Sequence, residues 1–159
     1  MAVDEKMNIR FDLSLRNSTF HTHRLRELNT QYGLGGDKAR EALIQFDKIR
    51  SQIQATLTWI TSNYMDSNEV SLLLGQFADW GADLLMLREQ PERLTALLKL
   101  AKELAHNNGL RRHESVHLGN LGIVYRKSAN LEEAIRCLKE AMQIAIETSD
   151  RELQGIWSG

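Results

Sequence analysis

A repeat with a period of about forty residues constrains the fold of this chain more than any other feature. At that shift the segment 89–108 lies on the segment 129–148. The matched pairs share their residue type: Glu92 with Glu132, Leu98 with Leu138, Ala101 with Ala141 and Ala105 with Ala145. The last ten residues, DRELQGIWSG, fall on LRRHESVHLG at the same period. Repeats of this length indicate supersecondary units that bury their apolar faces by stacking on one another.

Helices are the predicted content of these units, because apolar residues recur at steps of three and four. Residues that break helices are scarce, with one Pro and ten Gly in 159 residues. We therefore predict an all-α chain of about six helices, with short connections that favour antiparallel neighbours. The predicted starts lie near Ser18, Asp37, Asp66, Pro91, Arg111 and Asn130, and the chain barely enters a seventh helix after Asp150.

The first sixteen residues do not follow the helical pattern. Ile9, Phe11, Leu13 and Leu15 alternate with polar residues as they would in a strand. A lone strand has no ladder to join, so we expect 1–16 to be an extended or disordered lead-in. The other predicted segments are an N-terminal helical hairpin over 17–66, a degenerate helix pair over 67–110, the best-defined pair over 111–149 and the start of a truncated repeat over 150–159.

Several residues have the chemistry of helix starts. A side-chain oxygen can accept a hydrogen bond from the free amides of the first helical turn, and proline fits where no amide donor is needed. On this basis the predicted caps are Asp37, Asp66 with Glu69 as a capping box, Asn130 and Asp150, and Pro91 is placed at the first position of its helix. Cys137, which lies in an apolar register, is expected to be a small buried hydrophobe.

The pair over 111–148 alternates large and small residues in a fixed order. It reads Leu118, Leu121, Gly122, Tyr125, Ala134, Leu138 and Ala141. Gly122 and Ala134 are small where two antiparallel helices would cross closely, and the large residues would fill the surrounding space. This order resembles the tetratricopeptide repeat, in the long-period variety of the sensor regions of bacterial STAND or NB-ARC signalling ATPases and of kinesin light chains. The period exceeds the usual length of about 34 residues, and Ile146 stands where a proline often closes the repeat.

The resemblance implies a right-handed α-solenoid that binds a protein or peptide in a concave groove. In this family the first helix of each repeat lines the groove, and the positions that match are Val116, Gly119, Asn120, Ile123, Arg126 and Lys127. The implied contacts with the partner are made by Asn120, whose amide both donates and accepts, and by an acidic group of the ligand on Arg126 and Lys127. We expect a scaffold or sensor module of a larger signalling protein, although the chain has no phosphate-binding GxxxxGK[ST] loop.

A rival motif is His113-Glu114-Ser115-Val116-His117, which has the HExxH pattern of zinc hydrolases. Histidines four residues apart on a helix can share a metal ion, and the glutamate would polarise its bound water. A third ligand would have to come from the partner helix, and no strand that could hold a substrate is predicted. We therefore expect no catalysis and no cofactor, and keep a zinc site on His113 and His117 as the alternative.

Composition narrows the range of partners. Twenty basic residues nearly balance twenty-one acidic ones, so nucleic acid is disfavoured as a partner. No apolar run has the length of a membrane span, no signal peptide is evident, and one cysteine permits no internal disulfide, so a cytoplasmic location is expected.

An array that ends within its third repeat would leave apolar surface uncovered, which predicts self-association or a C-terminal continuation.

Overall fold

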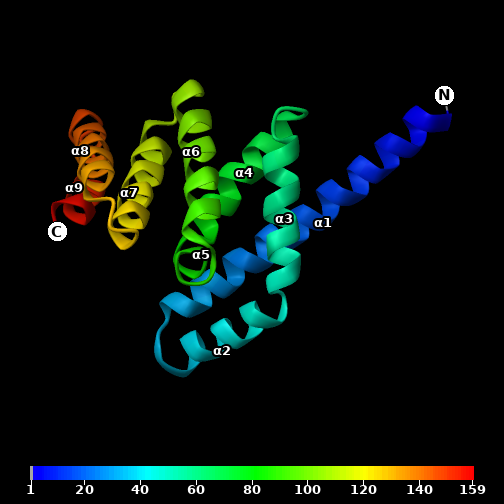
Figure 1. Cartoon of the computed structure of the whole chain (residues 1–159), viewed down its shortest axis with the longest axis horizontal. Coiled ribbons are helices and arrows are strands. Elements are labelled where there is room, and N and C mark those ends of the chain that lie inside the picture. Colours follow the sequence, from blue (N-terminus) through cyan, green and yellow to red (C-terminus); the bar gives the residue numbers. More distant parts are fainter. Residues whose placement is uncertain (1) are drawn as a thin grey trace. The chain divides into compact units, whose positions relative to one another are not determined.

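The computed structural model describes residues 2–159, and these residues form nine α-helices and no strand (Figure 1). The predicted all-α class is therefore confirmed for the described chain. The predicted number of about six helices is wrong, because two of the expected helices are each divided in two and the short last helix forms. The helices belong to two compact units: unit 1 extends to Leu84, and unit 2 runs from Leu85 to Gly159.

Unit 1 is organised around one long helix. Its elements are α1 (Ala2–Gly33), α2 (Gly36–Lys48), α3 (Arg50–Asn63), α4 (Asn68–Trp80) and the first residues of α5 (Ala82–Arg88). Helix α1 contacts each of α2, α3 and α4 (Figure 1). Large side chains from these helices, among them Leu25, Phe46, Ile60 and Phe77, are almost completely buried and form the core of the unit.

The expected extended lead-in over 1–16 is wrong, because α1 begins at Ala2. Successive residues of a helix are turned by about 100°, so alternate residues lie on nearly opposite sides. Phe11 and Leu15 are accordingly half-buried, whereas Ile9 and Leu13 are exposed. The ring of Phe11 lies 5.4 Å from that of Trp59 on α3. The alternation of apolar and polar residues therefore reflects two faces of one helix and not a strand.

The long helix predicted after Asp37 is broken at Ile49, whose backbone leaves the helical region at φ −106° and ψ 12°. Two of the predicted caps in this unit are also wrong. Helix α2 begins after Gly35 with no side-chain cap, and Asp37 lies in its first turn. Helix α4 is capped by Ser67, whose hydroxyl accepts from the amide of Glu69 at 3.1 Å, and not by Asp66.

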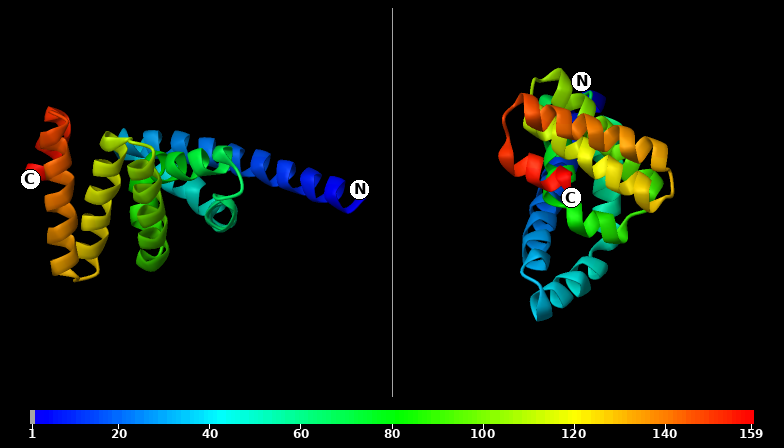
Figure 2. Two further views of the ribbon diagram at one scale, coloured as in Figure 1. Left: turned by 90° about the horizontal axis from the view of Figure 1, so that it is seen from above. Right: turned by 90° about the vertical axis from the view of Figure 1, so that its left-hand side faces the viewer.

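Unit 2 contains α6 (Pro91–Asn107), α7 (Arg111–Lys127), α8 (Leu131–Glu147) and α9 (Arg151–Ser158), after the end of α5. Helices α6, α7 and α8 lie side by side, each next to the one that follows it in the chain (Figure 2). Pro91, Asn130 and Asp150 hold the helix-start positions that the sequence predicts for them, and Cys137 is buried. The boundary between the units, however, falls inside the segment 67–110 that was expected to be one helix pair.

Three turns with one backbone geometry join the helices of unit 2. Gly109, Ala129 and Ser149 follow one another at intervals of twenty residues, and all three have positive φ, at 67°, 60° and 55°. In each turn the amide of this residue and the amide of the next one donate to carbonyls of the last helical turn, which is the Schellman arrangement. Two such helices and turns make forty residues, so the sequence period is visible directly in the backbone.

Among the described residues, no single helix is both long and apolar enough to cross a membrane. Helices α4 and α5 meet the length and composition requirement only when they are counted together across the bend between them.

Candidate functional site

The crossing of α7 and α8 positions the candidate site, and it depends on one small residue. A Cβ atom added to Gly122 would lie 2.6 Å from Cγ of Leu138 and 3.2 Å from the carbonyl oxygen of Ala134. The first distance requires Leu138 or α8 to shift, and the second is tighter than an ordinary van der Waals contact. The sequence prediction that Gly122 and Ala134 lie where two helices touch is therefore confirmed.

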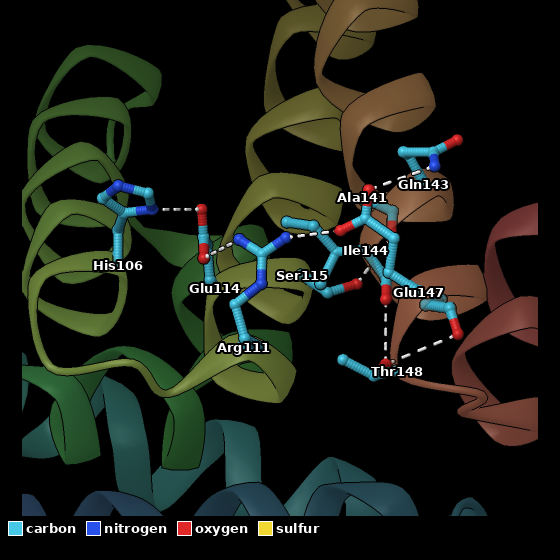
Figure 3. A network of polar contacts seen from close by, with 10 residues as sticks. His106, Arg111, Glu114, Ser115, Ala141, Gln143, Ile144, Glu147 and Thr148 are labelled. Carbon is cyan, nitrogen blue, oxygen red and sulfur yellow. Dashed lines mark hydrogen bonds and ion pairs between the residues drawn. The ribbon is translucent and has the colours of Figure 1, made fainter.

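A network of charged side chains holds the first turn of α7 (Figure 3). Arg111 donates to Glu114 and to Glu147 of α8, each at 2.7 Å. The other carboxylate oxygen of Glu114 is 3.0 Å from Nδ1 of His106 on α6. Because the Glu114 carboxylate is largely buried, its contacts with Arg111 and His106 offset the cost of removing it from water. The network thus ties α7 to both neighbouring helices.

Helix α9 lies against α7 and α8, and Trp157 of α9 contacts α7. A Cβ atom on Gly119 would overlap the Trp157 ring, so the indole occupies space that only glycine leaves open. The indole Nε1 donates to Oγ of Ser115 at 3.1 Å, and Ser115 in turn donates to the carbonyl of Ala141 at 2.8 Å. Ser115 is fully buried, and this chain of two hydrogen bonds satisfies its hydroxyl.

One side of α7 carries four residues that are not fully buried. Val116, Asn120, Ile123 and Lys127 follow one another at steps of four, three and four, which aligns them along one side of a helix. The first three are half-buried and Lys127 is exposed. We call these four residues the α7 strip. It offers aliphatic groups, one amide and one positive charge, and none of its members is acidic.

Arg126 does not belong to the α7 strip. Its helical position aligns it with Ser115, Gly119 and Gly122, which face α8 and α9. Arg126 is exposed, but it lies about 100° around the helix from Lys127. The sequence analysis grouped these two residues as one site for an acidic group, whereas the helix separates their directions.

The residues of the HExxH motif lie on α7 but differ in their exposure to solvent. His113 is exposed, whereas His117 is 1% exposed and Glu114 is buried. Burial is the main cause that lowers the pKa of His117 to about 4, and the nearby His113 adds to it. The Glu114 carboxylate is engaged by Arg111 and His106. Within residues 2–159 no group of three or more His, Cys, Asp or Glu side chains is arranged to hold a metal ion.

Sequence reasoning missed the residues that fix α7 and α9. Arg112 forms ion pairs with Asp150 and Glu152, which links the starts of α7 and α9. Asp150 and Glu152 lie 38 and 40 residues after Arg112, so the forty-residue period could have indicated these contacts. The contact of Trp157 with Gly119 had a weaker signal, a second glycine three residues before Gly122.

Comparison with known proteins adds no relative to this description. No family model matches the chain, and neither the curated proteins nor the solved structures contain a match.

Proposed function

We propose that unit 2 is a tetratricopeptide-like helical stack that binds a protein or peptide partner through the α7 strip. In this proposal the helices of unit 2 are arranged as a right-handed solenoid. The chain serves as a cytoplasmic scaffold or sensor module of a larger signalling or regulatory protein. The observation that carries the proposal is the α7 strip itself: half-buried aliphatic groups, an amide and a cation along one helix face.

The surroundings of the strip support a binding role. The close approach at Gly122 and the network around Glu114 fix α7 between its neighbours, so the strip is presented by a rigid element. Rigid presentation lowers the entropic cost of binding, because fewer groups have to be ordered when the ligand binds. The regular twenty-residue spacing of the turns in unit 2 is what a helical repeat protein requires.

The residues of the α7 strip suggest different contacts. The Asn120 amide would bridge the donor and acceptor of a ligand's main chain. Val116 and Ile123 would cover an apolar side chain, and Lys127 would meet an acidic group. Arg126 would reach an acidic group only from the α9 side of α7.

Selection from a random peptide library tests the proposal. We expect purified chain to enrich peptides whose affinity falls about 5- to 30-fold in Asn120→Ala and in Lys127→Glu, because each contact contributes about 1 to 2 kcal/mol. Asn107→Ala is the control, since Asn107 is an asparagine of unit 2 that is exposed and lies at the end of α6. Peptides that bind all of these variants equally would overturn the assignment to the α7 strip.

The zinc-hydrolase alternative has no comparable support. A hydrolase would need Glu114 to face a metal-bound water, and here its carboxylate contacts Arg111 and His106. His113 and His117 also differ in exposure, so a shared ion would require His117 to leave its buried position.

A further inference from the structure

Helix α1 carries a second apolar face that the core of unit 1 does not use. Leu25 and Leu28 lie on the packed face and are completely buried. Ile9, Leu13 and Phe20 lie on another face of the same helix, at steps of four and seven residues. They are 53%, 59% and 65% exposed. Three large apolar side chains along one exposed helix face mark an interaction surface more often than isolated ones do.

Two charged residues, Arg16 and Asp12, accompany this apolar face. Arg16 lies three residues after Leu13 and four before Phe20, so it shares their side of the helix. We call Ile9, Leu13, Arg16 and Phe20 the outer stripe of α1. Asp12 lies one turn before Arg16, and both residues line a groove between α1 and Leu72 of α4. The edge of the outer stripe next to α4 therefore carries Asp12 and Arg16, and Glu69 of α4 lines the same groove.

The sequence of the outer stripe is complementary to itself in the antiparallel direction. When two α1 helices are related by a two-fold axis between Ser14 and Leu15, Ile9 lies opposite the partner's Phe20. Leu13 then lies against the aliphatic stem of the partner's Arg16, and Asp12 comes within reach of the guanidinium of the partner's Arg16. Each contact occurs twice, as an isologous interface requires.

A parallel arrangement lacks this complementarity. It would place Arg16 directly against the partner's Arg16 in the middle of the contact, where two like charges repel at short distance. Charge therefore selects the antiparallel arrangement of the two helices.

We propose that the chain forms an antiparallel dimer through the outer stripe of α1. The stripe offers three apolar side chains per subunit, so the interface is small, and the dimer is expected at micromolar concentrations or above. This proposal is independent of the α7 strip, which lies in unit 2.

Sedimentation equilibrium of the full chain tests the dimer. The wild-type chain is expected to dimerise as its concentration rises, and Leu13→Asp is expected to raise the dissociation constant by roughly a hundredfold, because it places two carboxylates in the apolar contact. Ile44→Asp is the matched control, since Ile44 is a half-exposed apolar residue of unit 1 on α2. Circular dichroism of both variants checks that the helices remain folded.

A charge exchange tests the direction of the pairing. Asp12→Arg and Arg16→Asp are each expected to weaken the dimer by about tenfold, and the double variant is expected to restore it, because the ion pair reforms with reversed signs. In oxidising conditions Ile9→Cys combined with Phe20→Cys should yield a covalent dimer, whereas Ile9→Cys alone should not. The native Cys137 is buried and does not compete in this experiment.

Three results would overturn the proposal. The first is a chain that stays monomeric over the whole concentration range. The second is efficient disulfide formation by Ile9→Cys alone, which would show parallel helices. The third is a dimer that resists Leu13→Asp and is lost in Ile135→Asp, which would assign the contact to the exposed apolar residues of α8.

Discussion

Gly75 of unit 1 and Gly122 of unit 2 both lie in the interior of a helix, yet they face different surroundings. A Cβ atom on Gly75 would meet nothing within 4 Å, whereas one on Gly122 would press on Leu138 and on the backbone of Ala134. The same residue type is thus a weak point of helix α4 and a packing requirement of helix α7. A glycine within a helix indicates close packing only where a neighbouring helix lies against the face that carries this glycine.

The connections of the two units differ in the same way. Unit 2 repeats one turn at Gly109, Ala129 and Ser149, so successive helices are joined with the same backbone geometry. In unit 1, α1 and α2 are joined through Leu34 and Gly35, and α2 and α3 by a break at Ile49. Unit 2 is therefore organised by local repetition, whereas unit 1 depends on α1 as a common packing surface.

The largest expected effect concerns the buried His117 of unit 2. Its folded-state pKa of about 4 lies below the ordinary value of 6.5, so the unfolded chain takes up a proton first as the pH falls. Stability that is present above pH 6.5 should be lost progressively towards pH 4, by roughly 3 kcal/mol. Urea unfolding at several pH values measures it. His117→Gln should lose this part of the pH dependence, whereas the exposed His23→Gln in unit 1 should keep it.

The two glycines test the comparison directly. Gly122→Ala should reduce the free energy of unfolding by about 2 kcal/mol, because the added methyl group overpacks the contact with α8. Gly75→Ala should instead raise it by up to about 1 kcal/mol, since alanine favours the helix and has space. Hydrogen exchange of the native protein reports each unit separately. Equal effects of the two substitutions would show that the contrast between the units is wrong.

The repeated turns predict a smaller effect. Ala129 and Ser149 adopt a left-handed backbone that costs residues with a side chain about 1 kcal/mol relative to glycine. Ala129→Gly and Ser149→Gly should therefore each stabilise unit 2 by about 1 kcal/mol, as measured by thermal unfolding. Gly109→Ala is the reverse control and should destabilise it by a similar amount. Stabilisation by all three changes would contradict the assigned turn geometry.

The smallest effect is expected at Leu110. It precedes α7 just as Asn130 precedes α8 and Asp150 precedes α9, but it has no side chain that caps the helix. Leu110→Asn should add the missing acceptor for the first turn of α7 and stabilise unit 2 by about 0.5 to 1 kcal/mol. Leu131→Asn, one residue after the cap of α8, is the control and should bring no such gain.

Prediction from sequence succeeded where periodicity and local chemistry agree. The forty-residue repeat located α6, α7 and α8, and Asn130 and Asp150 were recognised as caps because an oxygen at a helix start satisfies a free amide. It failed for residues 1–16, where two apolar faces of one helix imitate the alternation of a strand. Four of the five candidate binding residues share the α7 strip, whereas Arg126 faces another direction. Their role in binding stays a prediction.

By itself, the sequence determined that this chain is helical, where the helices of unit 2 begin, and that Gly122 and Ala134 lie at a crossing. These properties depend on residues close in the chain or on a repeated spacing. Only the tertiary structure decided that the units divide after Leu84, that Trp157 rests on Gly119, and which charged groups surround Glu114. Such contacts join residues far apart in the chain, and their free energy depends on the distance and burial that folding alone creates.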